Sequence, residues 1–157
     1  MKAIVPATVL LAIVSAPTSA QTVRGVWKPV EVVISKGPNA GRHTTDVQPG
    51  LLFLTDSHYS IMFVSGFAAR PPLSAQPTDS DRARAFESFI AQAGTYQLKD
   101  SILTRTPIVA KNPGVMVGES YATRMRAVAD TIWFTVTAAD TVETRTKWVR
   151  VERLPAR

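Results

Sequence analysis

Short turns divide the chain into stretches with strand character, and their spacing constrains the fold more than any other feature. One strand pattern begins at Gly25-Val26-Trp27, and another ends just beyond Trp148-Val149-Arg150. Between them lie six more strand patterns, with connections as short as residues 100–101 and 129–130. Connections this short join antiparallel neighbours. The sequence therefore predicts an eight-stranded antiparallel meander with almost purely local pairing, which is typical of small barrels.

The expected elements follow from residue type and spacing. Strands are rich in β-branched and aromatic residues and are bounded by turn formers. One helix is expected over residues 78–93, because Thr78 offers a capping oxygen and Phe86, Phe89 and Ile90 recur at helical spacing. The expected strands cover residues 23–35, 51–55, 59–65, 95–99, 102–109, 119–128, 131–137 and 142–154.

Gly94 is expected to end this helix, and the helix is expected to cover the outside of the sheet. Residues 51–55 and 59–65 are more apolar than simple alternation gives, which suits strands that are covered on both faces. The loop at residues 66–77 is long for a connection without structure of its own. It is interpreted either as a lid over the barrel or as a plain connector.

The first 20 residues have the pattern of an export signal. Lys2 supplies a positive charge, residues 3–16 are mostly apolar, and Pro17-Thr18-Ser19-Ala20 supplies small residues for cleavage after Ala20. The apolar run is too short to span a bilayer. Without cysteine the chain has no lipid attachment at the cleavage site and no disulfide. We expect one domain at residues 21–157, soluble and periplasmic or secreted; the alternative is an uncleaved anchor.

The chain is basic, with 18 Lys and Arg against 12 Asp and Glu, and a net charge of +6. Such a surplus favours attraction to anionic surfaces. The basic residues are spread over the expected helix and at least three strands. We interpret them as solvated faces and expect no nucleic-acid partner.

Several short motifs follow one another in an order that resembles a known family. They are Gly25-x-Trp27, Gly50-x-Leu52-x-Leu54-Thr55, Tyr59, Gly94-x-Tyr96, Asn112-Pro113, Val117-Gly118 and Trp148-x-Arg150. In this order they resemble the lipocalin-like domain family of small bacterial proteins over nearly all of residues 21–157. The resemblance implies an eight-stranded calycin-type barrel, whose ligand is unassigned in most members. A barrel of this size either fills its interior or holds one small ligand.

The chain also departs from the family pattern. His58 stands where a turn glycine is common, and Arg105 stands where a histidine is frequent. An activity that relies on that imidazole therefore does not carry over. The resemblance further implies that Arg150 crosses the face of Trp27 at the closed end in a cation–π contact. Trp27 and Arg150 are accordingly interpreted as structural.

Counting in steps of two from the family's inward positions assigns one face of each strand to the interior. These residues are Leu52, Leu54, Tyr96, Leu98, Leu103, Arg105, Tyr121, Thr123, Met125, Ile132, Phe134, Thr146 and Trp148. Trp148 is expected in the core at the barrel floor. Trp133 has the opposite phase and is expected under the helix. The predicted ligand site consists of Leu54, Tyr96, Arg105, Tyr121, Met125 and Phe134.

Arg105 carries the strongest functional prediction. A guanidinium among apolar side chains stays charged and needs an anionic or carbonyl partner. A fatty acid or another amphiphilic carboxylate would supply one, with its tail against the apolar interior. Alternatively, Arg105 pairs with Glu119 or Glu31, or extends to solvent at the strand end. Tyr96 and Tyr121 offer hydroxyls either to a polar ligand end or to neighbouring carbonyl groups.

Patterns for catalysis or metal binding are weak. His43 and His58 lie in expected turns, outside any nucleophile pattern. Zinc spacing and a phosphate-binding loop are absent from the sequence. Asp46 and Asp56 could join His58 at a barrel rim, but aspartates are common in turns. We expect no metal and no cofactor.

The sequence is best interpreted as an exported protein that binds a hydrophobic or amphiphilic small molecule without chemistry. One alternative is a barrel enzyme of isomerase or cyclase type, which would need Glu119 or Glu31 near Tyr121 in a dry pocket. Another is a structural or interaction module with a filled barrel and a partner on the outer face of residues 59–65. The barrel interior distinguishes these three functions: a cavity with one polar anchor favours binding, two convergent ionisable groups favour catalysis, and a filled interior favours the module.

Overall fold

The computed structural model describes residues 23–70, 72–116, 118–138 and 141–155. The predicted signal peptide lies outside the described residues. Within these residues strands dominate, together with the α-helix α2 (Asp79–Glu87) and the 3-10 helix η1 (Pro113–Met116). The strands are β1 (Gly25–Lys36), β2 (His43–Thr44), β3 (Gly50–Leu54), β4 (His58–Val64), β5 (Phe89–Lys99), β6 (Ile102–Ala110), β7 (Tyr121–Val128), β8 (Thr131–Ala138) and β9 (Val142–Glu152).

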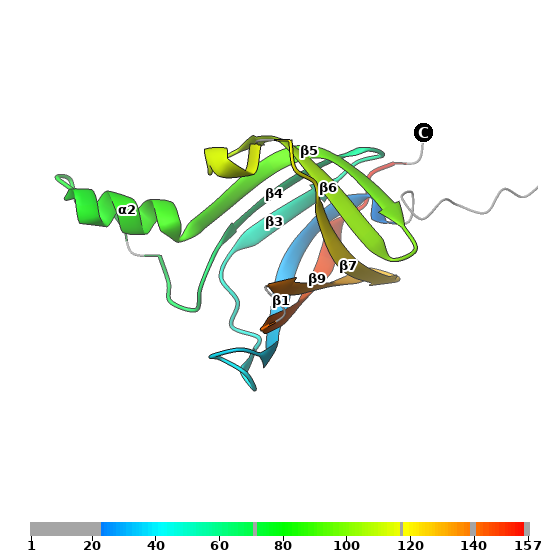
Figure 1. Ribbon diagram of the computed structural model, residues 1–157, viewed down its shortest axis with the longest axis horizontal. Coiled ribbons are helices and arrows are strands. Elements are labelled where there is room, and N and C mark those ends of the chain that lie inside the picture. The colour runs from blue at the N-terminus through cyan, green and yellow to red at the C-terminus, as the bar shows by residue number, and fades with distance from the viewer. Residues whose placement is uncertain (1–22, 71, 117, 139–140, 156–157) are drawn as a thin grey trace, which may run out of the picture.

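Eight of these strands close into an antiparallel barrel (Figure 1). Neighbours in the sheet run in the order β1, β3, β4, β5, β6, β7, β8 and β9, and β9 returns to pair with β1. That last pairing runs from Val26 opposite Glu152 to Lys36 opposite Glu143. Closure removes exposed strand edges from the sheet. The two-residue β2 pairs with β1 outside the ring. The predicted all-β fold class is thus confirmed.

The core lies at the end of the barrel that carries the β3–β4, β5–β6 and β7–β8 turns. Leu54 borders the turn at residues 55–57, and Leu103 follows the turn at residues 100–101. On β3 and on β5 to β9, the buried side chains belong to the face that the sequence predicts to point inward. The buried cluster consists of Val23, Trp27, Leu52, Leu54, Tyr59, Ile61, Tyr96, Leu103, Met125, Ile132, Phe134 and Trp148.

Trp27 and Arg150 join the first and last strands at this closed end. The Arg150 guanidinium carbon lies 4.1 Å from the Trp27 ring centroid, so the contact that the resemblance implied is present. Trp27 is fully buried, and its indole N–H donates to the Val23 carbonyl at 3.0 Å. Arg150 Nε donates to Asp130 Oδ1 at 2.8 Å, and its Nη1 donates to the Arg24 carbonyl. One guanidinium therefore links β1, β9 and the β7–β8 turn.

The strands separate toward the opposite end. β1 pairs with β3 only through Gly25–Trp27, opposite Leu52–Leu54. β6 pairs with β7 only from Ile102 opposite Arg124 to Arg105 opposite Tyr121. Backbone pairing between these neighbours stops at these points, and the barrel is open at the end opposite the β3–β4, β5–β6 and β7–β8 turns.

The helix is shorter than predicted. Its start agrees with the sequence, because Thr78 caps it and forms a capping box with Asp81. It ends at Glu87 rather than at residue 93, and Phe89 already begins β5 opposite Val64. Residues 89–93 pair with β4, and this tertiary pairing overrides their helical spacing.

The helix also does not cover the sheet as predicted. None of its residues is buried, and it projects away from the barrel (Figure 1). The sequence of α2 is mostly polar, so it has little apolar surface to bury. Trp133 lies not under this helix but on the outer face of β8, with the Arg126 guanidinium 5.2 Å from its ring. Among the described residues, no helix has the length and apolar character needed to cross a membrane.

Gly94 lies inside β5 at an irregularity in the pairing with β6 rather than at the end of a helix. A Cβ atom at this position would lie 2.0 Å from the Thr106 carbonyl oxygen and 2.9 Å from the Ile108 nitrogen. Glycine within a strand often marks such a close backbone approach. The absence of a side chain therefore lets β5 and β6 pack together here.

We predict that Gly94→Ala lowers the free energy of unfolding by about 1–3 kcal/mol, the usual cost of overpacking. Urea denaturation followed by circular dichroism measures the change. Gly114→Ala is the control, since its Cβ would meet only the flexible Asn112 side chain, at 3.3 Å. Equal stability of the Gly94 variant and the unaltered protein would contradict this interpretation.

Candidate functional site

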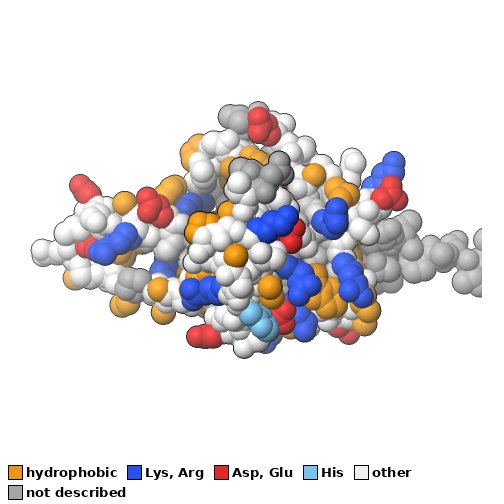
Figure 2. All heavy atoms as spheres, turned by 60° about the horizontal axis from the view of Figure 1, so that its bottom comes forward, with side chains coloured by type: hydrophobic (Ala, Val, Ile, Leu, Met, Phe, Trp, Pro, Cys, Tyr) orange, Lys and Arg blue, Asp and Glu red, His pale blue; other side chains and the backbone are white. Residues whose placement is uncertain are grey.

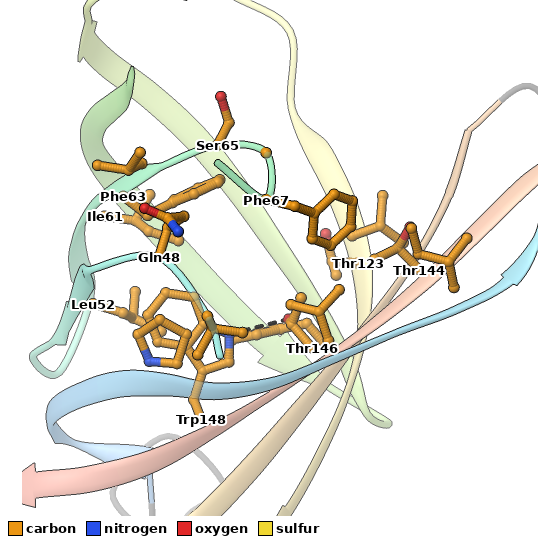
Figure 3. Close-up of a pocket in the computed structure, with 18 of the residues that line it drawn as sticks. Gln48, Leu52, Ile61, Phe63, Ser65, Phe67, Thr123, Thr144, Thr146 and Trp148 are labelled. Atoms are coloured by element: carbon orange, nitrogen blue, oxygen red, sulfur yellow. Dashed lines mark hydrogen bonds between the residues drawn. The ribbon is translucent and has the colours of Figure 1, made fainter. Parts of the chain in front are cut away.

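The open end of the barrel contains a cavity of about 360 Å³ (Figure 3). This volume is within the usual range for small-molecule sites. Its walls come from seven barrel strands and from the loops before β3 and after β4. The lining residues are Pro29, Val32, Ile34, Val47, Gln48, Leu52, Ile61, Phe63, Val64, Ser65, Gly66, Phe67, Leu103, Arg105, Thr123, Phe134, Val136, Thr144, Thr146 and Trp148.

The walls are mainly apolar because the inward positions of the strands are mainly apolar. Ile61 and Phe63 on β4 face Phe134 and Val136 on β8 across this space. Polar groups are few: the Gln48 amide, the Ser65 hydroxyl and three threonine hydroxyls. Arg105 is the one charged side chain among the described lining residues. The cavity therefore suits a largely apolar molecule with one anionic group.

Trp148 and Leu52 lie together at the inner end of the cavity (Figure 3). Trp148 is buried, and its indole N–H donates to Thr146 Oγ1 at 3.0 Å. The Phe134 ring meets the Trp148 ring edge to face, with centroids 6.3 Å apart. Because its indole N–H is already hydrogen-bonded, Trp148 presents an apolar surface to the cavity, at the boundary between the cavity and the packed core.

Arg105 projects inward from β6 beside the first residues of β7. Its Nη2 donates to Thr123 Oγ1 at 3.2 Å, and its guanidinium carbon lies 5.7 Å from the Tyr59 ring centroid. The Arg105 Nε and the Tyr59 hydroxyl are both buried, and neither has a hydrogen-bond partner in the part of the chain that the structure describes. Unpaired buried donors are costly, so this cluster has unused capacity to bind an acceptor.

No carboxylate lies within ion-pair distance of Arg105 among the described residues. Glu31, one candidate partner from the sequence, lies 3.9 Å from His43 Nε2. Glu119, the other candidate, is exposed. Burial lowers the pKa of Arg105, yet an arginine remains protonated in proteins. Among the residues that the structure describes, the positive charge in the lumen therefore has no counterion.

A second and more open cavity of about 720 Å³ adjoins the first. Arg105, Thr123 and Val136 line both spaces. Its other walls come from the end of α2, from β5, from the β6–η1 connection, and from the beginning of β7, where Tyr121 lies. The Arg105 guanidinium thus stands between an apolar space and a more polar one.

The remaining predicted site residues lie in different places. Leu54, Tyr96 and Met125 belong to the packed core and are not among the described residues that line the cavity. Phe134 lines the first cavity, and Tyr121 lines the second. Their roles in ligand binding, like that of Arg105, stay predictions.

Tyr59 was not singled out as a site residue from the sequence. Strand alternation places it inward, and the register of β4 and β5 places it beside Gly94, where no side chain separates it from β6. Burial raises the pKa of its phenol, so the hydroxyl stays protonated and able to donate. The feature of the sequence that could have identified Tyr59 is an inward tyrosine opposite a glycine on the neighbouring strand.

Phe67 lies over the mouth of the cavity (Figure 3). The Arg42 guanidinium carbon, from the β1–β2 connection, lies 3.6 Å from the Phe67 ring centroid. Farther along the same loop, Arg70 Nη2 donates to the Ala85 carbonyl of α2 at 2.8 Å. Gly66 and Phe67 line the cavity, whereas Arg70 holds the loop to α2. Opening and closing of residues 66–77 as a lid stays a prediction.

The imidazoles and candidate carboxylates lie away from the cavity walls. His58 Nδ1 contacts the Ser57 hydroxyl at 3.0 Å, and Asp56 pairs with Arg24 at 3.1 Å. Within the described residues, no group of three or more His, Cys, Asp or Glu side chains is arranged to hold a metal ion. Neither Glu31 nor Glu119 lines either cavity.

The Tyr96 hydroxyl is committed to the protein, because it donates to the Thr55 carbonyl at 2.6 Å. Burial raises its pKa to about 12, with the Asp56 carboxylate contributing. In the unfolded chain a tyrosine ionises near pH 10. Between about pH 10 and 12 the folded state therefore retains a proton that the unfolded state releases, and stability falls as the pH rises.

We predict that Tyr96→Phe reduces this alkaline loss of stability. At neutral pH the variant is destabilised by about 1 kcal/mol, because the Thr55 carbonyl loses its donor. Urea unfolding at a series of pH values from neutral to about pH 12 measures both effects. An identical pH slope in the variant and the unaltered protein would show that Tyr96 titrates normally.

Together, the pairing and the cavity define a closed antiparallel β-barrel whose interior is open at one end. No protein-family model matches the chain, and no curated protein matches it in sequence. A redesigned β-barrel matches with a TM-score of 0.42 and 11% identity, over 84% of this chain and 94% of that one. A de novo designed fluorescence-activating β-barrel matches with a TM-score of 0.40 and 12% identity, over 84% and 96%. The barrel assignment accordingly rests on the strand pairing described above.

Proposed function

We propose that this protein belongs to the lipocalin-like family and holds a hydrophobic or amphiphilic small molecule with a carboxylate end. The observation that carries the proposal is Arg105, a charged side chain on a mainly apolar wall with no carboxylate partner among the described residues. A charge in such a place is costly unless it is paired. A carboxylate ligand would supply the pairing.

The proposed ligand places its apolar part along Ile61, Phe63 and Phe134 and its carboxylate at Arg105. A guanidinium donates to both oxygens of a carboxylate in a planar, bidentate pair. The Tyr59 hydroxyl, which also has no partner among the described residues, belongs to the core beside Arg105 and lines neither cavity, so Arg105 is the donor that reaches the ligand. In a low-dielectric interior these hydrogen bonds are stronger than they are in water.

The contents of the lumen favour binding over the two alternatives. A purely structural barrel would be filled, whereas this one contains a cavity of about 360 Å³. A catalytic site of the expected type would bring Glu31 or Glu119 to Tyr121, and neither lines the second cavity, where Tyr121 lies and where Glu87 is the acidic residue among the described lining residues. Arg105 is the one charged residue among the described residues that line the first cavity, which suits recognition of an anionic group.

We further propose that the protein acts in the periplasm or outside the cell. The support is the signal-like pattern of Lys2, the apolar residues 3–16 and the small residues up to Ala20. The lack of cysteine is compatible with a barrel that is stabilised by packing alone. Amino-terminal sequencing of protein recovered from its own host tests this location.

The carboxylate preference is tested with two fluorescent probes that share one alkyl chain, one ending in a carboxylate and the other in an alcohol. We predict that Arg105→Met weakens carboxylate binding about tenfold to a hundredfold, the usual contribution of a charged hydrogen bond. Binding of the alcohol changes by no more than about twofold. Fluorescence titration gives both dissociation constants.

The control is Arg82→Met, which removes an exposed arginine from α2 and leaves the lumen intact. It should bind both probes as the unaltered protein does. Equal weakening of the two probes by Arg105→Met would assign Arg105 a structural role, and absence of binding to either probe would reject the proposed ligand class.

A further inference from the structure

The register of β7, β8 and β9 brings together basic residues that are far apart in the sequence. Thr123, Phe134 and Thr146 point inward, so the residues next to them point outward. In one cross-strand row, Arg124 lies opposite Thr135, and Thr135 lies opposite Arg145. In the next row, Arg126 lies opposite Trp133, and Trp133 lies opposite Lys147. We call Arg124, Arg126, Trp133, Arg145 and Lys147 the basic face.

The basic face carries four cations within a small area. Neighbouring strands are about 4.8 Å apart and alternate residues about 7 Å apart, so the two rows are adjacent. Arg124, Arg126 and Arg145 are exposed. None of the four cations forms an ion pair within the described residues. Glu31, opposite Lys147, is the one acidic residue that continues these rows onto β1.

Hydrophobic side chains accompany this charge. Trp133 is half-buried between Arg126 and Lys147. A third row, toward the closed end, carries Val128 and Val149 on either side of Thr131. Val128 is 49% exposed. Figure 2 shows Lys and Arg side chains interspersed with hydrophobic ones over the face that comes forward from the bottom of Figure 1.

We infer that the basic face docks the protein onto a lipid bilayer that contains anionic lipids. Unpaired cations attract anionic headgroups. Tryptophan is the side chain most suited to the boundary between headgroups and acyl chains. The row of valines would meet the same boundary. A nucleic-acid backbone would neutralise the cations but would leave these valines without an apolar partner.

The test uses the full chain and vesicles of phosphatidylcholine with or without about one third phosphatidylglycerol. Residues 1–22 are common to every variant, so their contribution cancels. Each Lys or Arg beside an anionic bilayer strengthens binding about fivefold. The double variant R126Q/R145Q should therefore bind the anionic vesicles about thirtyfold more weakly in a sedimentation assay.

The matched control is R82Q/K99Q, which removes the same charge from exposed positions on α2 and at the end of β5. It should weaken binding by no more than about twofold. If both double variants weakened vesicle binding equally, net charge alone would explain the binding, and the proposal would be overturned. Binding to a polynucleotide without binding to anionic vesicles would also overturn it.

Fluorescence quenching by brominated phosphatidylglycerol gives an independent readout. Trp27 and Trp148 are buried inside the barrel, whereas Trp133 is on the basic face. Bromine should quench the unaltered protein on anionic vesicles, and most of that quenching should be lost in Trp133→Phe. Quenching that persists in the variant would place another surface on the bilayer and reject the basic face.

Discussion

The pairing of β1 with β9 is the constraint on which the rest of the structure depends. A sheet of this size with a free first and last strand would expose two hydrogen-bonding edges and could not enclose an interior. Closure is reinforced where Arg150 of β9 crosses Trp27 of β1 and hydrogen-bonds to Asp130 in the β7–β8 turn. Because these contacts lie at one end, that end is packed, and the strands are free to diverge at the other.

This asymmetry places the candidate site. Trp148 lies where the packed half ends and provides a floor whose own polar atom is satisfied. Above it Arg105 lies beside Tyr59, and each has a buried donor that finds no partner among the described residues. Farther along the sheet, β7 and β9 carry arginines on their outer faces that form no ion pair among the described residues. Inside, a cation surrounded by apolar groups suits an anionic guest; outside, cations beside tryptophan and valine suit a lipid surface.

Strand periodicity explains how much of this could be predicted from sequence. Leu52, Leu103, Arg105 and Phe134 point inward as counting in twos predicts, because burial on one face fixes the phase of a strand. The end of α2 was misplaced because Phe89 and Ile90 fit a helical pattern equally well, and only pairing with β4 decides between the two. The basic face was missed for a similar reason. Arg124 and Arg145 come to flank Thr135 only through the register of β8, which composition and spacing do not reveal.

The central claim is that the Arg105 guanidinium binds the anionic group of a ligand that enters the barrel. The most direct measurement is the ¹H–¹⁵N resonance of Arg105 Nε, assigned by its loss in Arg105→Lys, as a long-chain fatty acid is added. The account predicts a saturable shift of this resonance and slower exchange of its proton with water, as expected for a group that gains a carboxylate partner. An unchanged Arg105 resonance while resonances elsewhere in the barrel shift would contradict it.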